Sequence, residues 1–254
     1  MPAWIHLPLL ADAALCLGLG AGLGLLGGML GIGGGLIAIP LLALLYGMDQ
    51  ALAQGTALVM VVPNVLLGFW RYHQREPVQF GRLASMLLPA VVAARLSARV
   101  ATGMDPGLLR HAFAAFLVAL TGLLVWQHGR PLQAERQPWH PRLLPLVGLG
   151  SGVMSGLFTI GGGLVVVPAL VVLFGLPQTL AQGMALAMVV PGALVALASY
   201  AQSGHVAWAV GLPMAVGGVL TVSAGVGLAH ALPAAVLRRV FYGVLLGTAA
   251  VMVH

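Results

Sequence analysis

The chain alternates between long apolar runs and short polar breaks. A helix that crosses a bilayer needs about 20 mainly apolar residues, and most of the runs approach that length. The strict alternation of polar and apolar positions that spanning β-strands would need does not occur. The pattern therefore predicts an all-α polytopic membrane protein. The runs cover roughly 8–29, 33–46, 50–70, 83–101 and 107–126, and then 143–158, 161–175, 178–200, 206–229 and 234–253.

The composition agrees with this prediction. Hydrophobic residues make up 60% of the chain and charged residues only 6%, whereas a soluble domain carries about 25% charged residues. All the basic residues are arginines and the formal net charge is +6. In such a chain the arginines indicate membrane orientation, and we do not expect nucleic-acid binding. The single cysteine, Cys16, excludes an intramolecular disulfide.

Residues 27–72 and 155–200 are two copies of one sequence, related by adding 128 to each number. Gly33 thus corresponds to Gly161, and about half of the paired positions are identical. Beyond these segments the match weakens, although the Leu-Pro pair at 88–89 resembles that at 212–213. A duplicated hydrophobic unit with broken helices is typical of transporters. We expect an N-terminal transmembrane repeat at 1–126, a polar linker at 127–142 and a C-terminal transmembrane repeat at 143–254, with about five helical segments in each repeat.

The second run of each repeat is short for a membrane span. As a helix, residues 33–46 would rise about 21 Å, against a hydrocarbon core of about 30 Å. We therefore expect that this helix either tilts in a thin region of the membrane or starts below the surface after a non-helical or re-entrant glycine-rich elbow. Such a backbone is tolerated at depth only where protein or water satisfies it. The arginine distribution favours five crossings per repeat over four by the positive-inside rule. An odd number of crossings inverts the second repeat relative to the first. Both termini would then lie on the outer side of the bacterial cytoplasmic membrane.

Each short run begins with a triple-glycine elbow, in GIGGGLIAIP at 31–40 and TIGGGLVVVP at 159–168. Glycines permit tight turns and leave the first N–H groups of the next helix unshielded. Those groups carry part of the helix dipole and can bind an anion. The alternative is that the glycines only allow close helix packing. We expect the elbows to meet near the midplane and hold a small oxyanion, with candidate residues Gly33, Gly34, Gly35, Thr159, Gly161, Gly162 and Gly163.

The repeated Ala-Gln-Gly triplets add Gln54 and Gln182 to this candidate site. A glutamine in an apolar span is costly unless it is hydrogen-bonded, so its amide either donates to an anion or joins two helices. The second role is worth about 0.6 kcal/mol on average in a membrane protein. The small polar residue Thr56 is a further site candidate, and Asn64 and Ser199 are second-rank candidates. Each is expected to bond its own helix backbone more often than a ligand.

Four prolines lie inside the predicted spans, where they kink a helix or act as hinges. They are Pro40, Pro63, Pro168 and Pro191. Asp12 is the one acidic residue expected within a span, so it is the candidate for proton coupling together with the histidines. The histidines are scattered without metal-ligand spacing, and no nucleophile turn of a hydrolase occurs. We therefore expect no metal, no cofactor and no enzymatic activity.

The repeats resemble the TauE/SafE family of bacterial sulfite exporters. The residues that carry the resemblance are GGMLGIGGGLIAIPLL with QALAQGTAL, and SGLFTIGGGLVVVPAL with QTLAQGMAL. The resemblance implies a permease that exports sulfite or a related small sulfur-containing anion by alternating access. Related thiosulfate importers carry functional cysteines in comparable segments. Here Cys16 lies outside both elbows, which argues against a cysteine relay.

Two other interpretations stay open: a non-transporting membrane partner of a sulfur-metabolism enzyme, and a permease for a different ion. Polar docking surface, which the first requires, is confined to the linker at 127–142. Histidines, which a cation permease would use, are absent from both glycine-rich segments. The partners expected from sequence are the lipid bilayer and a small sulfur-containing anion, and a homodimer is left open.

Overall fold

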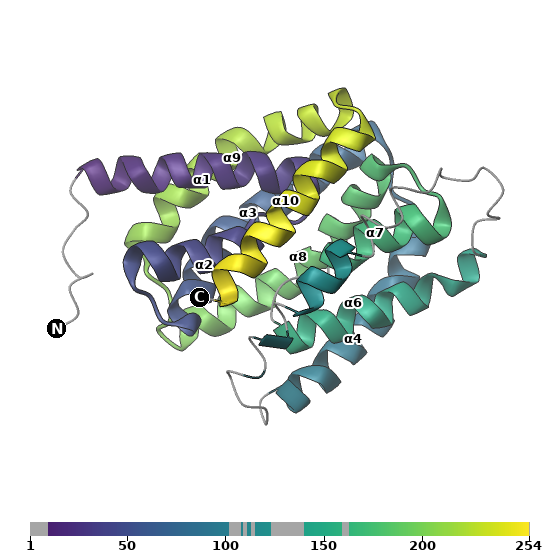
Figure 1. Cartoon of the computed structure of the whole chain (residues 1–254), viewed down its shortest axis with the longest axis horizontal. Helices are drawn as coiled ribbons and strands as arrows, with labels where there is room; N and C mark the ends of the chain where they lie inside the picture. Colours follow the sequence, from purple (N-terminus) through teal and green to yellow (C-terminus); the bar gives the residue numbers. More distant parts are fainter. Residues whose placement is uncertain are drawn as a thin grey trace. The chain divides into compact units, whose positions relative to one another are not determined.

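A computed structural model describes residues 10–101, 108, 111–112, 115–122, 140–158 and 163–253 (Figure 1). The described residues form helices and short turns, without a strand among them. The prediction of an all-α chain is therefore confirmed. The helices are α1 (Leu10–Leu30), α2 (Gly35–Tyr46), α3 (Gln50–Arg75), α4 (Phe80–Ala101), the 3₁₀ turn η2 (Pro141–Leu143), α6 (Leu144–Phe158), α7 (Gly163–Phe174), α8 (Gln178–Gln202), α9 (Trp208–Ala231) and α10 (Ala234–Val253).

Helix lengths follow the pattern of the apolar runs. Within the described residues, five helices are long and apolar enough to cross a membrane: α1, α3, α4, α8 and α9. Helices α2 and α7 have 12 residues each and rise only about 18 Å. The expected non-helical glycine start is confirmed for α2, which begins at Gly35. Of the run at 107–126, residues 115–122 are helical, and most of the predicted linker at 127–142 lies outside the described residues.

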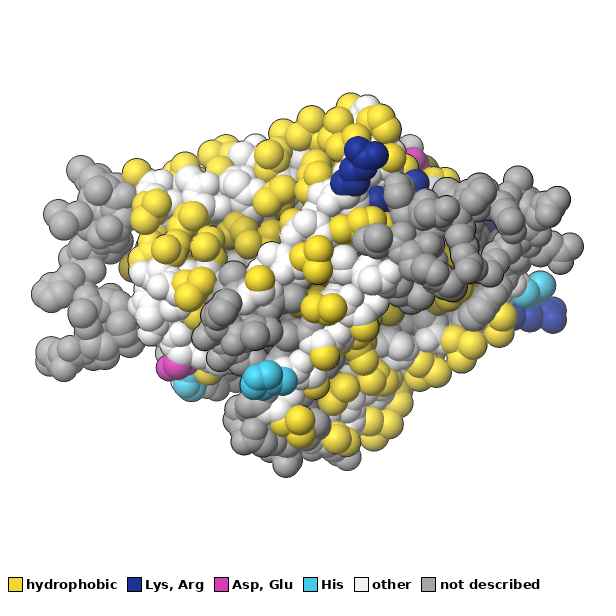
Figure 2. All heavy atoms as spheres, in the orientation of Figure 1, with side chains coloured by type: hydrophobic (Ala, Val, Ile, Leu, Met, Phe, Trp, Pro, Cys, Tyr) yellow, Lys and Arg dark blue, Asp and Glu magenta, His cyan; other side chains and the backbone are white. Residues whose placement is uncertain are grey.

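The surface of the described chain is apolar. Large hydrophobic side chains stand exposed along the helices, with Leu88 at 72%, Val195 at 69% and Leu220 at 69%. In the view of Figure 2 hydrophobic side chains cover much of the described surface, and charged side chains are few. Contiguous apolar patches of this kind are rare on soluble monomers. Lipid is the solvent that suits them, as the composition predicts.

The chain divides into two compact units that both draw on the two sequence repeats. Unit 1 comprises Met1–Arg71 and Val189–Ala231, and unit 2 comprises Tyr72–Met188 and Leu232–His254. Unit 1 therefore contains α1, α2, most of α3, the end of α8 and α9. Unit 2 contains the end of α3, α4, α6, α7, the start of α8 and α10. The long helices α3 and α8 each begin in one unit and end in the other.

Each unit contains one very close helix crossing (Figure 1), of α1 with α9 in unit 1 and of α6 with α4 in unit 2. Glycines every fourth residue allow it: a Cβ on Gly24 would lie 2.5 Å from Cα of Gly218, and one on Gly28 2.6 Å from O of Val222. Small residues let helix backbones approach in this way. In unit 1 the facing residues are Gly20 with Met214, Gly24 with Gly218 and Gly28 with Val222, and in unit 2 Gly148 with Met86, Gly152 with Ala90 and Gly156 with Ala94.

These two crossings use equivalent positions. The glycines of α1 and those of α6 are related by the offset of 128. The residues of α4 that face α6 and the residues of α9 that face α1 are related by the same offset. The helix that opens each repeat thus packs on the fourth helix of the other repeat. The Leu-Pro pairs at 88–89 and 212–213 differ by 124 instead of 128. They are therefore offset by four residues, about one helical turn, from the alignment that the helix contacts follow. The inverted orientation of the repeats stays a prediction.

Candidate functional site

The glycine elbow of unit 1 ends α1 and starts α2. Gly31, Gly33 and Gly34 have φ of 71°, 72° and 83°, a left-handed conformation that costs other residues energy. The N–H groups of Gly31, Ile32 and Gly33 all donate to the carbonyl of Gly27, at 3.0, 3.2 and 3.4 Å. The elbow therefore closes the end of α1 with backbone groups alone.

Packing against α1 and α3 requires the same glycines. A Cβ on Gly34 would lie 2.8 Å from the carbonyl oxygen of Leu23, and a Cβ on Gly27 would lie 2.5 Å from the nitrogen of Gly34. On the α3 side, a side chain at Gly33 would meet Val61 and Val65. The glycines of this elbow therefore serve close packing, and whether they also expose the first amides of α2 to an anion stays a prediction.

The N-terminus of α2 is buried without a side-chain cap. Gly34 is the N-cap residue and makes no side-chain hydrogen bond to the helix, and residues 31–34 are all buried. The first N–H groups of a helix have no intrahelical acceptor and carry about half a positive charge from the helix dipole. This arrangement attracts a small anion or a water molecule.

The equivalent elbow of the second repeat is described only in part. Gly163 is the first residue of α7 and is buried. Thr159, Gly161 and Gly162 lie outside the described residues. Whether the two elbows share one ligand stays a prediction.

Both candidate glutamines are held by tyrosines. The hydroxyl of Tyr72 donates to Oε1 of Gln182 at 2.9 Å, and the hydroxyl of Tyr200 donates to Oε1 of Gln54. Gln182 is fully buried and Gln54 is 8% exposed. Each bond joins the start of one long helix to the end of the other, so the interhelical role of the glutamines is confirmed. Donation from their NH₂ groups to an anion stays a prediction.

Sequence reasoning missed the two tyrosines, although a signal for them was present. Tyr72 and Tyr200 are related by the same offset of 128 as the two glutamines. A polar residue that recurs in both copies of an apolar repeat is expected to have a partner that also recurs. Searching the aligned copies for that partner would have found them.

The small polar residues near the elbow behave in three different ways. Ser199 donates to the carbonyl of Val195 at 2.9 Å, as expected. For Thr56 that expectation is wrong, because its hydroxyl accepts from the N–H of Ala207 at 3.0 Å and so fixes the start of α9. It is also wrong for Asn64, which is 1% exposed and whose side-chain amide atoms have no hydrogen-bond partner among the residues that the structure describes.

The predicted kink residues lie within helices, as expected. They are Pro40 in α2, Pro63 in α3, Pro168 in α7 and Pro191 in α8. Each removes one helical hydrogen bond. A hinge function for them stays a prediction.

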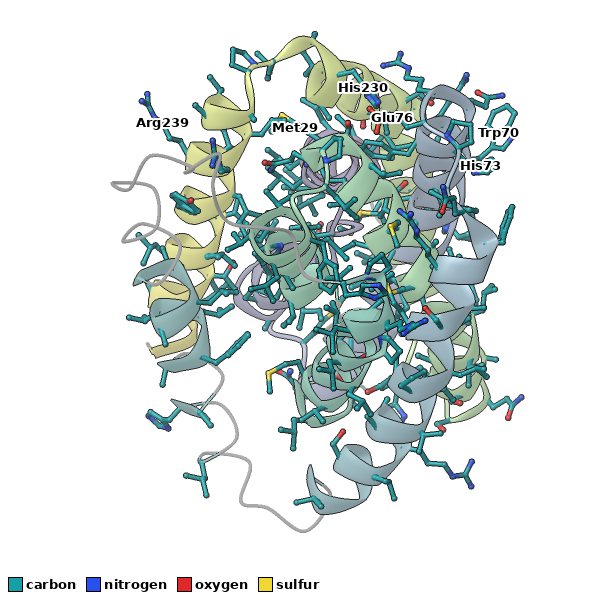
Figure 3. The ribbon with its side chains drawn as sticks, turned by 90° about the vertical axis from the view of Figure 1, so that its right-hand side faces the viewer. Met29, Trp70, His73, Glu76, His230 and Arg239 are labelled. Atoms are coloured by element: carbon teal, nitrogen blue, oxygen red, sulfur yellow. The ribbon has the colours of Figure 1, made fainter. Side chains whose placement is uncertain are left out.

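Acidic residues near the spans are few. Asp12 lies in α1. Glu76 follows the end of α3 (Figure 3), where its Oε1 accepts from the hydroxyl of Thr179 at 2.5 Å. This contact places a carboxylate beside the first turn of α8, where the helix dipole favours negative charge. Among the described residues, no group of three or more His, Cys, Asp or Glu is placed to hold a metal ion.

Comparison with known proteins adds to this geometry. The family model for the sulfite exporter TauE/SafE matches residues 16–252. The chain belongs to the TauE/SafE family. A probable membrane transporter protein of Xylella fastidiosa is 32% identical over 231 residues, which are 87% of this chain and 86% of that protein. The probable membrane transporter protein YunE of Bacillus subtilis is 23% identical over 218 residues, 76% of this chain and 80% of that protein. This TauE/SafE member is a multi-span membrane protein of a transporter family.

Proposed function

We propose that this TauE/SafE member is a permease that exports sulfite or a related small sulfur-containing anion by alternating access. The observation that carries the proposal is the buried, uncapped start of α2 at Gly34. Oriented backbone N–H groups attract an anion without a full positive charge beside it. A site built in this way binds weakly enough to release its ligand, which a transporter requires.

The energetics of export suit a site without charged side chains. An anion that leaves a cell with a negative interior moves down the electrical gradient, by about 2.3 kcal/mol per charge per 100 mV. Export therefore needs no proton or sodium gradient. Asp12 and the histidines are the residues that proton coupling would use. We place the chain in the bacterial cytoplasmic membrane with both termini outside.

Transport by the purified, full-length protein in liposomes tests the function. Radiolabelled sulfite flux is measured against protein-free liposomes, first with an imposed membrane potential and then with an imposed pH gradient. The proposal expects protein-dependent flux that follows the potential. Flux that responds to the pH gradient but not to the potential contradicts uncoupled export, and flux equal to that of protein-free liposomes contradicts the transport function.

Substitution at the elbow tests the site. Gly35 is the first residue of α2, and a Cβ there would lie 3.1 Å from Val61 Cγ2, so Gly35→Leu places a side chain over the first amides of the helix. Gly22→Leu is the matched control, because Gly22 is exposed on α1 and a Cβ there has no neighbour within 4 Å. We expect sulfite flux to fall at least about tenfold in the first variant and to be unchanged in the second. Equal flux in both folded variants would contradict the site.

A further inference from the structure

Asn64 on α3 is a buried polar side chain for which the described part of the chain supplies no partner. It is 1% exposed, and neither Nδ2 nor Oδ1 has a hydrogen-bond partner within residues 10–101, 140–158 and 163–253 or the other described positions. Leaving such a group unpaired destabilises a fold, and in lipid no water is at hand to compensate. Native proteins keep few such groups, and each one calls for a reason such as a ligand or a bound water.

The surroundings of Asn64 are shaped to admit its amide. A Cβ on Gly218 would lie 2.5 Å from Nδ2 and 2.7 Å from Oδ1 of Asn64, and the amide is its nearest neighbour. Gly218 in turn lies against Gly24 at the crossing of α1 and α9. The equivalent of Gly218 in the other repeat is Ala90, and the equivalent of Asn64 is Gly192. The polar group and the space for it thus occur together, in one copy only.

Asn64 and the elbow (residues 31–35) adjoin the same helical turns of α1 and α3 in unit 1. On α3, Val61 and Val65 contact Gly33 of the elbow, and Asn64 is within one helical turn of both valines. On α1, Leu23 contacts Gly34, and its neighbour Gly24 contacts the glycine that Asn64 touches. The start of α2, which has no side-chain cap, and the Asn64 amide, which has no hydrogen-bond partner among the described residues, therefore border the same turns of α1 and α3.

We propose that Asn64 is a substrate-binding residue that selects oxyanions carrying one proton. An asparagine amide offers both donors and an acceptor. A fully deprotonated oxyanion has only acceptors, so it would leave Oδ1 unpaired and facing negative charge. An anion with one O–H accepts from Nδ2 and donates to Oδ1 and satisfies both. Hydrogen sulfite has this form, whereas sulfate at neutral pH does not. This inference rests on the proposed function and adds the protonation state of its substrate.

The first test separates a ligand role from a structural role. Asn64→Leu replaces the amide by an apolar group of similar size, which removes an unpaired buried polar group and is expected to raise the melting temperature. We expect sulfite flux in liposomes to fall at least about tenfold in the same variant. Gly192→Ala is the matched control at the equivalent position, because a Cβ there has no neighbour within 4 Å, and its flux should equal wild type. Wild-type flux in a stabilised Asn64→Leu protein would overturn the proposal and indicate a bound water or simple packing.

The second test moves the amide without removing it. Gly218→Ala places a methyl group where the Asn64 amide lies, and the end of a side chain can shift at little cost. We expect reduced sulfite flux in Gly218→Ala and no further reduction when it is added to Asn64→Ala, since the two changes then act through one group. Additive losses in the double variant would overturn the proposal.

The third test examines protonation and does not depend on transport. The melting temperature of the detergent-solubilised wild type is measured with sulfite, with inorganic phosphate and with sulfate at neutral pH. At neutral pH part of the sulfite is hydrogen sulfite, and all of the phosphate carries at least one proton. We expect stabilisation by sulfite and phosphate, weak stabilisation by sulfate, and loss of the difference in Asn64→Leu. Equal stabilisation by all three anions, or none, would overturn the inference. Asn64-dependent stabilisation in a protein that shows no flux would instead refute the transport function alone.

Discussion

Tyr72→Phe is the substitution that best tests how the long helices are held together. The tyrosine is 1% exposed and the glutamine that it contacts, Gln182, is fully buried. Their hydrogen bond of 2.9 Å joins the end of α3 to the start of α8 within unit 2. The change deletes one oxygen atom and leaves the ring in place, so the packing of the core is preserved.

The expected loss follows from the burial of both groups. A hydrogen bond in a membrane protein contributes about 0.6 kcal/mol on average and at most about 1.7 kcal/mol. Depriving a buried acceptor of its donor costs about 1–3 kcal/mol. We therefore expect Tyr72→Phe to lower the free energy of unfolding by about 1–2 kcal/mol. Tyr200→Phe, the equivalent change in unit 1, should cost less, because Tyr200 is only partly buried.

Unfolding by SDS in mixed micelles, followed by circular dichroism, measures these differences. A double-mutant cycle with Gln182→Leu isolates the contact, because the double variant replaces both partners by apolar groups and should recover most of the loss. A coupling energy indistinguishable from zero would refute the interpretation of this bond as a helix link. A loss in Tyr200→Phe as large as that in Tyr72→Phe would refute the argument from burial.

The remaining predictions concern stability, and the same unfolding assay measures each of them. Gly20→Ala should cost about 1–3 kcal/mol because its Cβ meets the backbone of α9, whereas Gly22→Ala, with open space around its Cβ, should gain about 0.5–1 kcal/mol; equal effects would contradict the close crossing. Thr56→Val should cost about 1–3 kcal/mol because it removes the acceptor of the buried amide of Ala207, the residue before α9, and Thr56→Ser should restore stability. Gly34→Ala combines a positive φ with a contact to α1. It should lower the free energy of unfolding more than Gly47→Ala, whose φ of 59° adds strain of about 1 kcal/mol but whose Cβ has open space around it. The reverse order would contradict the packing of the elbow.

The helices and the elbow could be predicted from sequence because their causes are local. A run of apolar residues has to be helical in lipid, since only a helix satisfies its own backbone there. Successive glycines favour a non-helical segment, and the expected glycine-rich elbow precedes α2, which begins at the third glycine, Gly35. The length of α2 then follows from the distance to the next glycine, Gly47, which caps its other end in a left-handed conformation.

The pairing of helices between the repeats could not be predicted from the same pattern. An apolar stripe indicates that a helix face is buried in protein or lipid. It does not indicate which helix packs against that face, because lipid tails are as apolar as leucine. The glycines at Gly20 and Gly148 indicate a close partner, and only the structure identifies α9 and α4 as the partners. The Leu-Pro pairs at 88–89 and 212–213 even suggest a register that the contacts do not follow.

The differences between the two copies are more informative about function than their similarities. Both copies keep the residues of the glutamine–tyrosine hydrogen bonds and of the glycine crossings. These residues hold helices together in the same way in both units. With the predicted inverted repeats, a protein built from two equivalent parts distinguishes the two sides of a membrane only through positions at which the copies differ. Polar examples are Asn64, whose equivalent is Gly192, and Glu76, whose equivalent is Gly204.

Both of these differences cost stability in an apolar setting or require a specific partner. Asn64 is buried and unpaired, and Glu76 needs Thr179, whose equivalent in the first copy is Ala51. A drift towards a merely stable fold would have removed an unpaired buried amide, because an apolar side chain of similar size stabilises that position. Its presence in unit 1, on the turn of α3 whose Val61 and Val65 face the elbow, is therefore the strongest physical reason to look for the anion there and not at the equivalent position of the second copy.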